Sequence, residues 1–201
     1  MDRPAVNRFE APVSVADQPG SVLLPGHDVP LGRYTTVRRL LPQRELRTVG
    51  AWCFADHFGP ADVASRPGMQ VPPHPHTGLQ TVTWLVEGEI LHRDSLGNVQ
   101  TIVPGQLNLM TSGRGIAHAE TSPARRPPVM HGLQLWVALP DAARHGEPRF
   151  EHHADLPSVT SSTVDVTVVV GEFDGVRSPA RVPAPLLGAQ LDLVGEARLP
   201  L

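Results

Sequence analysis

The sequence is poor in cysteine, and this excludes one class of stabilising bond. Cys53 is the only cysteine of the 201-residue chain, so an internal disulfide cannot form. Its neighbours Ala51, Trp52 and Phe54 are apolar, which predicts a buried thiol. We expect a protein of a reducing compartment, in the cytoplasm.

Long apolar runs and basic clusters are also missing. No stretch approaches the roughly 18 apolar residues of a membrane span, and we find no secretory signal near the N-terminus, so we expect neither membrane insertion nor export. The 17 basic residues are scattered, with only Arg38-Arg39 and Arg125-Arg126 adjacent. Because a nucleic-acid surface concentrates its basic residues, we do not expect nucleic-acid binding through a basic patch.

Nucleotide-binding and nucleophile motifs are absent as well. The sequence holds no GxSxG, P-loop or GxGxxG pattern, and nothing around Cys53 indicates a nucleophile. We also find no internal repeat of fixed period.

Proline and glycine, by contrast, are abundant. The 22 prolines and 18 glycines recur between short apolar segments, as turn residues do. No long apolar stripe of helical period is present, so the pattern predicts an all-β sandwich or barrel.

The chain divides into three predicted parts. Residues 1–32 form an extended arm, with a docked edge strand near residues 13–15 as one option; residues 33–140 form a barrel; residues 141–201 hold a connecting loop and C-terminal strands. We expect a polar loop from residue 140 to residue 157. β-branched and apolar runs predict strands at residues 49–58, 81–86, 89–94, 99–103, 107–111, 115–120, 131–139, 163–170 and 187–194.

Two short patterns carry metal-binding side chains. His74 and His76 are one residue apart, and His118 and Glu120 repeat that spacing, so each pair projects from one face of a strand. The chain between the pairs accommodates about four strands at roughly 8–12 residues each. The two pairs therefore meet only if a barrel closes, as in an antiparallel jelly roll.

Three imidazoles and one carboxylate suit Fe(II), Ni, Cu or Zn, and the donor set alone does not choose among them. A six-coordinate ion would keep two open positions, whereas a tetrahedral zinc would be closed and structural. Any one of these histidines alone is more commonly a surface or hydrogen-bonded core residue. The repeated spacing is what favours the metal site.

Other polar residues have weaker cases. His92 lies on a predicted strand and points either into the barrel or to solvent, and His57 beside Asp56 makes either a contact near the site or a turn contact. Arg114, between two glycines, either meets an anion or belongs to a structural turn.

Several segments together resemble the pirin family of the cupin superfamily. They are residues 37–39, 49–60, 74–83, 87–88, 92–97, 104–105, 110–120 and 131–137, within a resemblance that covers about residues 37–180. This resemblance implies a cupin β-barrel with one metal, usually iron, on His74, His76, His118 and Glu120. Some pirin-like proteins open the flavonol quercetin with O₂, with the carboxylate equivalent to Glu120 available as the base, whereas others act as regulators through protein contacts.

The chain departs from the family pattern at two points. Gln80 stands where the family usually has glutamate, so a carboxylate function there would be lost. Pirins normally carry a second barrel, and here we expect it to be missing or incomplete, with exposed edges that favour a homo-oligomer.

Two functions follow from the resemblance. One is an O₂-dependent dioxygenase acting on a small aromatic chelator, which requires a pocket open at the metal. The other is a non-enzymatic metal- or redox-responsive regulator, which predicts a capped ion and an exposed apolar patch.

Overall fold

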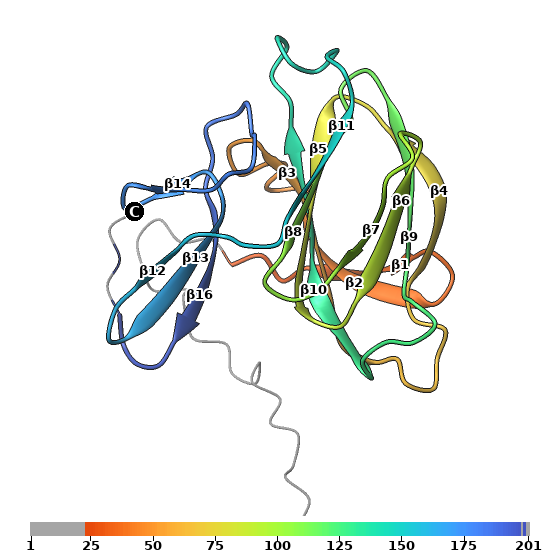
Figure 1. Ribbon diagram of the computed structural model, residues 1–201, viewed down its shortest axis with the longest axis horizontal. Helices are drawn as coiled ribbons and strands as arrows, with labels where there is room; N and C mark the ends of the chain where they lie inside the picture. The colour runs from red at the N-terminus through yellow and green to blue at the C-terminus, as the bar shows by residue number, and fades with distance from the viewer. Residues whose placement is uncertain (1–22, 198, 200–201) are drawn as a thin grey trace, which may run out of the picture.

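The computed structural model describes residues 23–197 and residue 199 (Figure 1). In this part of the chain all regular secondary structure is β-strand, and no helix is present, as the sequence predicts. The edge strand suggested near residues 13–15 lies outside the described residues.

Two facing antiparallel sheets form a jelly-roll barrel (Figure 1). The larger sheet has seven strands in the order β1-β2-β3-β10-β5-β8-β11. Their bounds are His27–Leu31 (β1), Thr35–Leu41 (β2), Trp52–Asp62 (β3), Val129–Ala138 (β10), Leu79–Glu87 (β5), Leu107–Thr111 (β8) and Arg149–His153 (β11). The smaller sheet has the order β4-β9-β6-β7, with bounds Gln70–His76 (β4), Ile116–Thr121 (β9), Ile90–Asp94 (β6) and Val99–Ile102 (β7).

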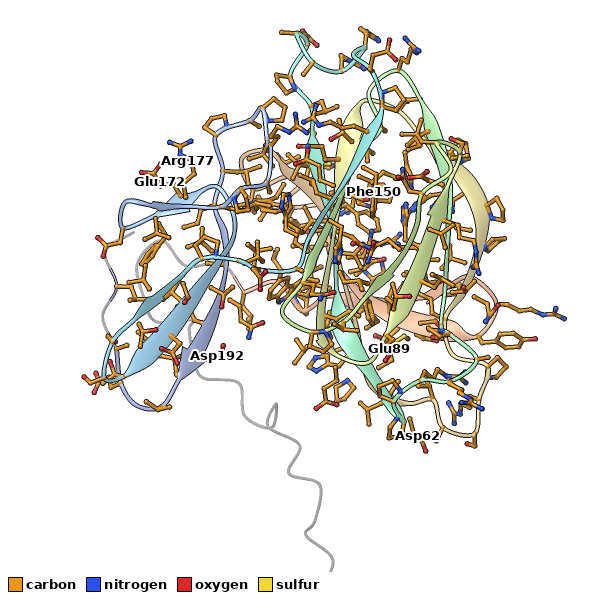
Figure 2. All side chains as sticks on the ribbon, viewed as in Figure 1. Asp62, Glu89, Phe150, Glu172, Arg177 and Asp192 are labelled. Atoms are coloured by element: carbon orange, nitrogen blue, oxygen red, sulfur yellow. The ribbon has the colours of Figure 1, made fainter. Side chains whose placement is uncertain are left out.

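A smaller set of strands follows the barrel, drawn in blue beside it in Figure 1. β12 (Ser158–Thr160), β13 (Val164–Val170) and β16 (Gly188–Leu193) form a three-stranded sheet. β14 (Glu172–Phe173) pairs with β15 (Val176–Arg177), and Figure 2 shows Glu172 beside Arg177, with which it forms an ion pair. These strands are consistent with the predicted incomplete second barrel, and the division at residues 32 and 140 stays a prediction.

Alternation along the strands separates two apolar cores. Val37, Phe58 and Leu85 point into the barrel and pack with Ile90 and Met130 from the other strands. Side chains on the other face of the larger sheet pack against the C-terminal strands. This second cluster includes Val82, Trp84, Leu107, Leu109 and Val137 of the larger sheet, with Val169 and Val170 of β13. The outer face of the larger sheet is therefore covered by the C-terminal part of the chain.

The predicted strands are found with three corrections. Residues 27–31, expected in the extended arm, form β1, which pairs with β2. The polar loop expected from residue 140 to 157 contains β11, which pairs with β8 and buries Glu151. β3 begins at Trp52 and not at Val49, because Val49 and Trp52 bond to each other across a tight turn. Between His76 and His118 lie β5, β6, β7 and β8, which confirms the four strands expected there.

A separate property concerns membranes. Among the described residues there is no helix with the length and hydropathy to span a bilayer.

Candidate metal centre

The two predicted ligand pairs meet on neighbouring strands. β4 and β9 are antiparallel partners in the smaller sheet, with His74 opposite His118 and Val71 opposite Glu120. The register shifts between Val71 and His74, at Pro72-Pro73, because proline has no N–H for the ladder. Residues distant in sequence are thus brought together by the closure of the barrel, as predicted.

The three histidines converge through the same ring atom. The Nε2 of His118 lies 3.1 Å from the Nε2 of His74 and 3.1 Å from the Nε2 of His76. His76 and His118 are buried, and His74 is half-buried at the edge of the cluster. One ligand atom from each of the three therefore lies within 4.8 Å of the others.

The backbone fixes the tautomer of His74. Its Nδ1 lies 2.9 Å from the carbonyl oxygen of Pro72, and because a carbonyl only accepts, Nδ1–H must donate. In the neutral ring the lone pair is then on Nε2, which faces His118. A lone pair directed at neighbouring imidazole nitrogens is the arrangement that a bound cation stabilises.

Burial favours the neutral imidazole of His76 and of His118, which is the state that binds a metal. Desolvation lowers the pKa of His76 to about 4, with a further contribution from His74. Desolvation also lowers the pKa of His118 to about 2, and the nearby rings of His74, His76 and His92 add to the effect.

Glu120 supplies a buried carboxyl group beside His118. Burial raises the pKa of Glu120 to about 7, although the Thr83 hydroxyl, which donates to Oε1 across 3.3 Å, lowers it. A ligand atom of Glu120 lies within 4.8 Å of His118 and His92, so Glu120 joins the cluster through His118. A dication in this place would favour the ionised carboxylate. The assignment of all four residues as ligands stays a prediction.

A small cavity of about 40 Å³ connects the four predicted residues. Asp56, expected from the sequence either near the site or in a turn, also lines the cavity. The sequence did not identify the rest of the lining, which is Leu31, Phe54, Val71, Gln134 and Trp136. The alternation of side chains along β3 and β10 is the sequence signal that could have identified residues 54, 56, 134 and 136, because it places them on the inward face.

Asp56 is an additional carboxylate in this wall, but it already has a partner. Arg39 donates from Nε and Nη2 to the two carboxylate oxygens at 2.9 and 2.8 Å, and the hydrogen bond with Asp56 raises the pKa of Arg39. The guanidinium also lies over the Phe54 ring, 4.5 Å from its centroid. The negative charge of Asp56 is therefore balanced by Arg39, whereas the carboxyl group of Glu120 is available to a metal ion.

The donor set fits one divalent transition metal. Three imidazole nitrogens and a buried carboxyl group suit such an ion, and a six-coordinate ion held by all four would have two positions left for other molecules. The chemistry available would be that of a Lewis acid in a small, largely buried site.

Two of the other polar residues lie away from the cavity. His57 approaches His131 on the outer face of the larger sheet, with the two Nε2 atoms 2.9 Å apart. Arg114 forms an exposed ion pair with Glu147, which favours the structural role considered for it. His92, in contrast, points into the barrel and is 2% exposed.

Gln80 also lies outside the cavity. It is fully buried, and its Nε2 donates to Thr111 Oγ1 and to the carbonyl of Arg181, both at 2.9 Å. The glutamine therefore connects the barrel to the C-terminal segment, and its identity does not change the donor set of the metal centre.

A family model described as Pirin matches residues 34–137, which include the whole cluster and most of the barrel. The chain belongs to the pirin family. It is a pirin-like protein with a cupin barrel and, on β4 and β9, a cluster of side chains of the kind that hold a metal ion.

Two curated pirin relatives illustrate the similarity. A Pseudomonas aeruginosa protein named "Putative quercetin 2,3-dioxygenase PA1205" is 53% identical over 162 residues, which are 80% of this chain and 51% of the relative. Human pirin is 37% identical over 161 residues, covering 78% of this chain and 53% of the relative. The chain thus spans about half the length of the curated relatives it matches.

A solved structure has the same fold at substantial identity. The crystal structure of quercetin 2,3-dioxygenase from Acinetobacter baumannii matches with a TM-score of 0.84 and 46% identity, over 88% of this chain and 59% of that one. A match over 88% of this chain is longer than residues 1–137, so it extends into the C-terminal part of the chain.

Proposed function

We propose that this pirin-family chain is a metal-dependent, O₂-dependent dioxygenase that opens a flavonol such as quercetin, with Fe(II) as its ion. Ni, Cu and Zn are the alternative ions. The observation that carries the proposal is the convergence of His74, His76 and His118 on one point beside the buried Glu120. The names of the P. aeruginosa and A. baumannii relatives supply the reaction class.

The metal cluster, Glu120 and Thr83 would have different roles in the proposed reaction. A divalent ion held by the cluster supplies a Lewis acid, which lowers the pKa of a coordinated hydroxyl group. Glu120 borders the cavity and can accept the hydroxyl proton of the substrate on a carboxylate oxygen. Thr83 donates to the Oε1 of Glu120 and so holds the carboxyl group in place.

Aromatic side chains form the wall opposite the smaller sheet. Trp136 stacks on Phe54 with ring centroids 3.9 Å apart, and its ring meets His76 edge-on at 5.0 Å. A flat aromatic substrate would contact this wall, which excludes water from the reacting ring.

The size of the cavity limits how a substrate enters. Its volume of about 40 Å³ is far below the roughly 300–1,000 Å³ of pockets for drug-sized ligands. Binding of a flavonol therefore requires the wall to open. Leu31, His74 and Trp136 are the half-buried residues of its lining.

A second candidate, a non-enzymatic regulator, is favoured by a different feature. A groove of about 450 Å³ lies between the larger sheet and β13 and β16, with a lining that includes Trp52, Val82, Trp84, Leu133, Leu135, Val169 and Leu187. A largely buried metal site together with an apolar groove is the combination expected of a regulator that binds partner proteins. The cytoplasmic location stays a prediction for either function.

Oxygen uptake distinguishes the two functions. The chain would be loaded with Fe(II) without air, its metal content measured, and quercetin added with O₂ under an oxygen electrode. We expect quercetin-dependent uptake by the wild type, none by His118→Ala, and wild-type uptake by His145→Ala, which removes an exposed loop histidine. Full metal occupancy without uptake would overturn the dioxygenase and support the regulator.

A further inference from the structure

The buried side chains of His118, His92 and Asp94 form a hydrogen-bonded line that extends from the metal cluster. β6 is the other neighbour of β9, with Asp94 opposite His118 and His92 opposite Glu120. The Nδ1 of His92 lies 3.4 Å from the Nδ1 of His118, and the Nε2 of His92 lies 3.2 Å from the Oδ2 of Asp94. The side chains of His92 and Asp94 are 3% and 0% exposed.

Hydrogen-bond chemistry gives this line a direction. A carboxylate only accepts, so the Nε2–H of His92 donates to Asp94. The neutral His92 then has its lone pair on Nδ1 and accepts from the Nδ1–H of His118. The remaining lone pair of His118 is therefore on Nε2, the atom that faces His74 and His76.

The carboxylate at the start of the line is firmly held. Its Oδ1 accepts from the backbone N–H groups of Leu96 and Asn98 at 2.9 and 3.1 Å, and the Nδ2 of Asn98 lies 3.0 and 2.9 Å from its two oxygens. The turn after β6 thus fixes which oxygen faces His92.

The ring of His92 is also fixed in position. Phe150, labelled on β11 in Figure 2, stacks on His92 with centroids 4.4 Å apart and an interplanar angle of 17°. Neither the ring nor the carboxylate can turn without losing these contacts.

We propose that His92 and Asp94 are positioning residues that hold His118 in the tautomer and orientation in which its Nε2 binds the metal. The inference rests on the metal centre of the proposed function and adds two residues from β6 to it. Partners of this kind typically change metal affinity by 10–100-fold.

Asp94→Asn is the most informative variant, because it reverses the direction of the hydrogen bonds from His118 through His92 to residue 94. The backbone donors of Leu96 and Asn98 require an oxygen at the Oδ1 position, so the new amide nitrogen replaces Oδ2 and donates to the Nε2 of His92. The hydrogen bond from Asn98 Nδ2 to Oδ2 is lost, and the one from Asn98 Nδ2 to Oδ1 can remain. The Nδ1 of His92 then carries the proton, His118 accepts on Nδ1, and its Nε2 carries a hydrogen instead of a free lone pair. Metal binding must first undo this arrangement.

His92→Phe is the second variant, and it separates hydrogen bonding from packing. A phenyl ring can keep the stack on Phe150, but it removes the acceptor for His118. Asp28→Asn is the matched control, because it makes the same chemical change in an exposed ion pair with Arg38. His118→Ala removes the ligand itself.

The test is a Zn²⁺ titration of the full chain against a competing chelator, with thermal unfolding of each metal-free variant as the measure of folding. We expect Asp94→Asn and His92→Phe to raise the Kd about 10–100-fold, Asp28→Asn to leave it unchanged, and His118→Ala to abolish binding. The visible spectrum at saturating Co²⁺ should be the same in wild type and both positioning variants, because the ligands are unchanged.

The contradicting outcomes are separable. Folded variants with a Kd within about twofold of wild type would overturn the positioning role and leave the metal centre intact. Loss of binding in His92→Phe as complete as in His118→Ala, or a changed Co²⁺ spectrum, would overturn it in favour of His92 as a ligand. A wild type that binds neither ion would overturn the metal centre itself.

Discussion

Arg38 and Arg39 are adjacent on β2, yet they have opposite energetic roles. Arg39 pairs with Asp56, whose side chain is 1% exposed, whereas Arg38 pairs with Asp28 at side-chain exposures of 56% and 61%. Removal of one partner from a buried pair leaves an uncompensated charge, and an exposed pair contributes little.

We therefore expect Arg39→Met to lower the free energy of unfolding by about 3 kcal/mol. Arg38→Met should change it by less than about 1 kcal/mol. Urea unfolding of the two variants measures the difference, and equal destabilisation would contradict the assignment of Asp56 as a buried, neutralised wall residue.

The convergence of His74, His76 and His118 could be predicted from the sequence because their spacing matches the period of a strand, whereas their role as ligands stays a prediction. The roles of His92 and Asp56 could not be predicted, because each depends on which face of its strand is inward and which partner lies opposite. Gln80 shows the same limit: family comparison identified the position, but only the register of β5 and β8 places it outside the barrel.

At the scale of elements, Glu151 fastens β11 to the C-terminal segment. Its carboxylate accepts from Arg149 Nε at 2.9 Å and from the backbone N–H of Arg181 at 3.3 Å, and His153 Nε2 lies 3.3 Å from it. Burial alone would raise the pKa of Glu151, but the hydrogen bonds from Arg149 and Arg181 outweigh it and lower the pKa below 4.5.

Glu151→Gln should therefore be less stable than wild type at neutral pH, by about 1–3 kcal/mol. A lowered folded-state pKa means that the carboxylate stabilises fully above pH 4.5, the unfolded value, and that the effect disappears as the pH falls through the lower folded value. Denaturant unfolding from pH 7 to pH 3 should show the two proteins converging in acid. Glu147→Gln, an exposed control, should match wild type throughout, and a constant gap for Glu151→Gln would contradict the ionic role.

The turn before β9 depends on a glycine. Gly113 has φ +49°, and an added Cβ would overlap the carbonyl oxygen of Gly146 in the loop after β10. Gly105 has φ +82°, but an added Cβ there would meet open space. The two positions share backbone strain and differ in packing.

Gly105→Ala should cost about 1–2 kcal/mol from the left-handed conformation alone. Gly113→Ala should cost more, about 3 kcal/mol or above, because the loop at Gly146 must also move. Thermal unfolding of both variants tests this, and the packing argument fails if their losses are the same.

Most strands were predictable because their β-branched and apolar residues alternate within bounds set by glycine and proline. β11 was missed because its sequence, Arg-Phe-Glu-His-His, is polar, and partners distant in sequence satisfy those groups. β1 was missed for a related reason, since its pairing with β2 and not its composition makes it a strand.

At the scale of the whole molecule, the C-terminal sheet exposes apolar residues. Leu191, Leu193 and Val194 are 43%, 60% and 83% exposed, and within the described residues β16 is bonded along one side only, to β13. An apolar strand at the edge of a sheet favours association with another chain, so a homo-oligomer stays our prediction.

We expect sedimentation of the wild-type chain to show mass increasing with concentration, and Leu193→Lys to reduce the associated fraction. Leu96→Lys changes an exposed leucine in the turn after β6 and should have no effect. A wild type that is monomeric at every concentration would contradict the prediction.

The central claim is that His74, His76, His118 and Glu120 on β4 and β9 hold one metal ion. The number of ions bound per chain measures this directly. Equilibrium dialysis against Fe(II), Ni²⁺ or Zn²⁺, followed by elemental analysis, should give one ion per wild-type chain and none in His118→Ala, with His145→Ala equal to wild type. A wild type without metal, or a His118→Ala variant that retains one ion, would contradict the central claim.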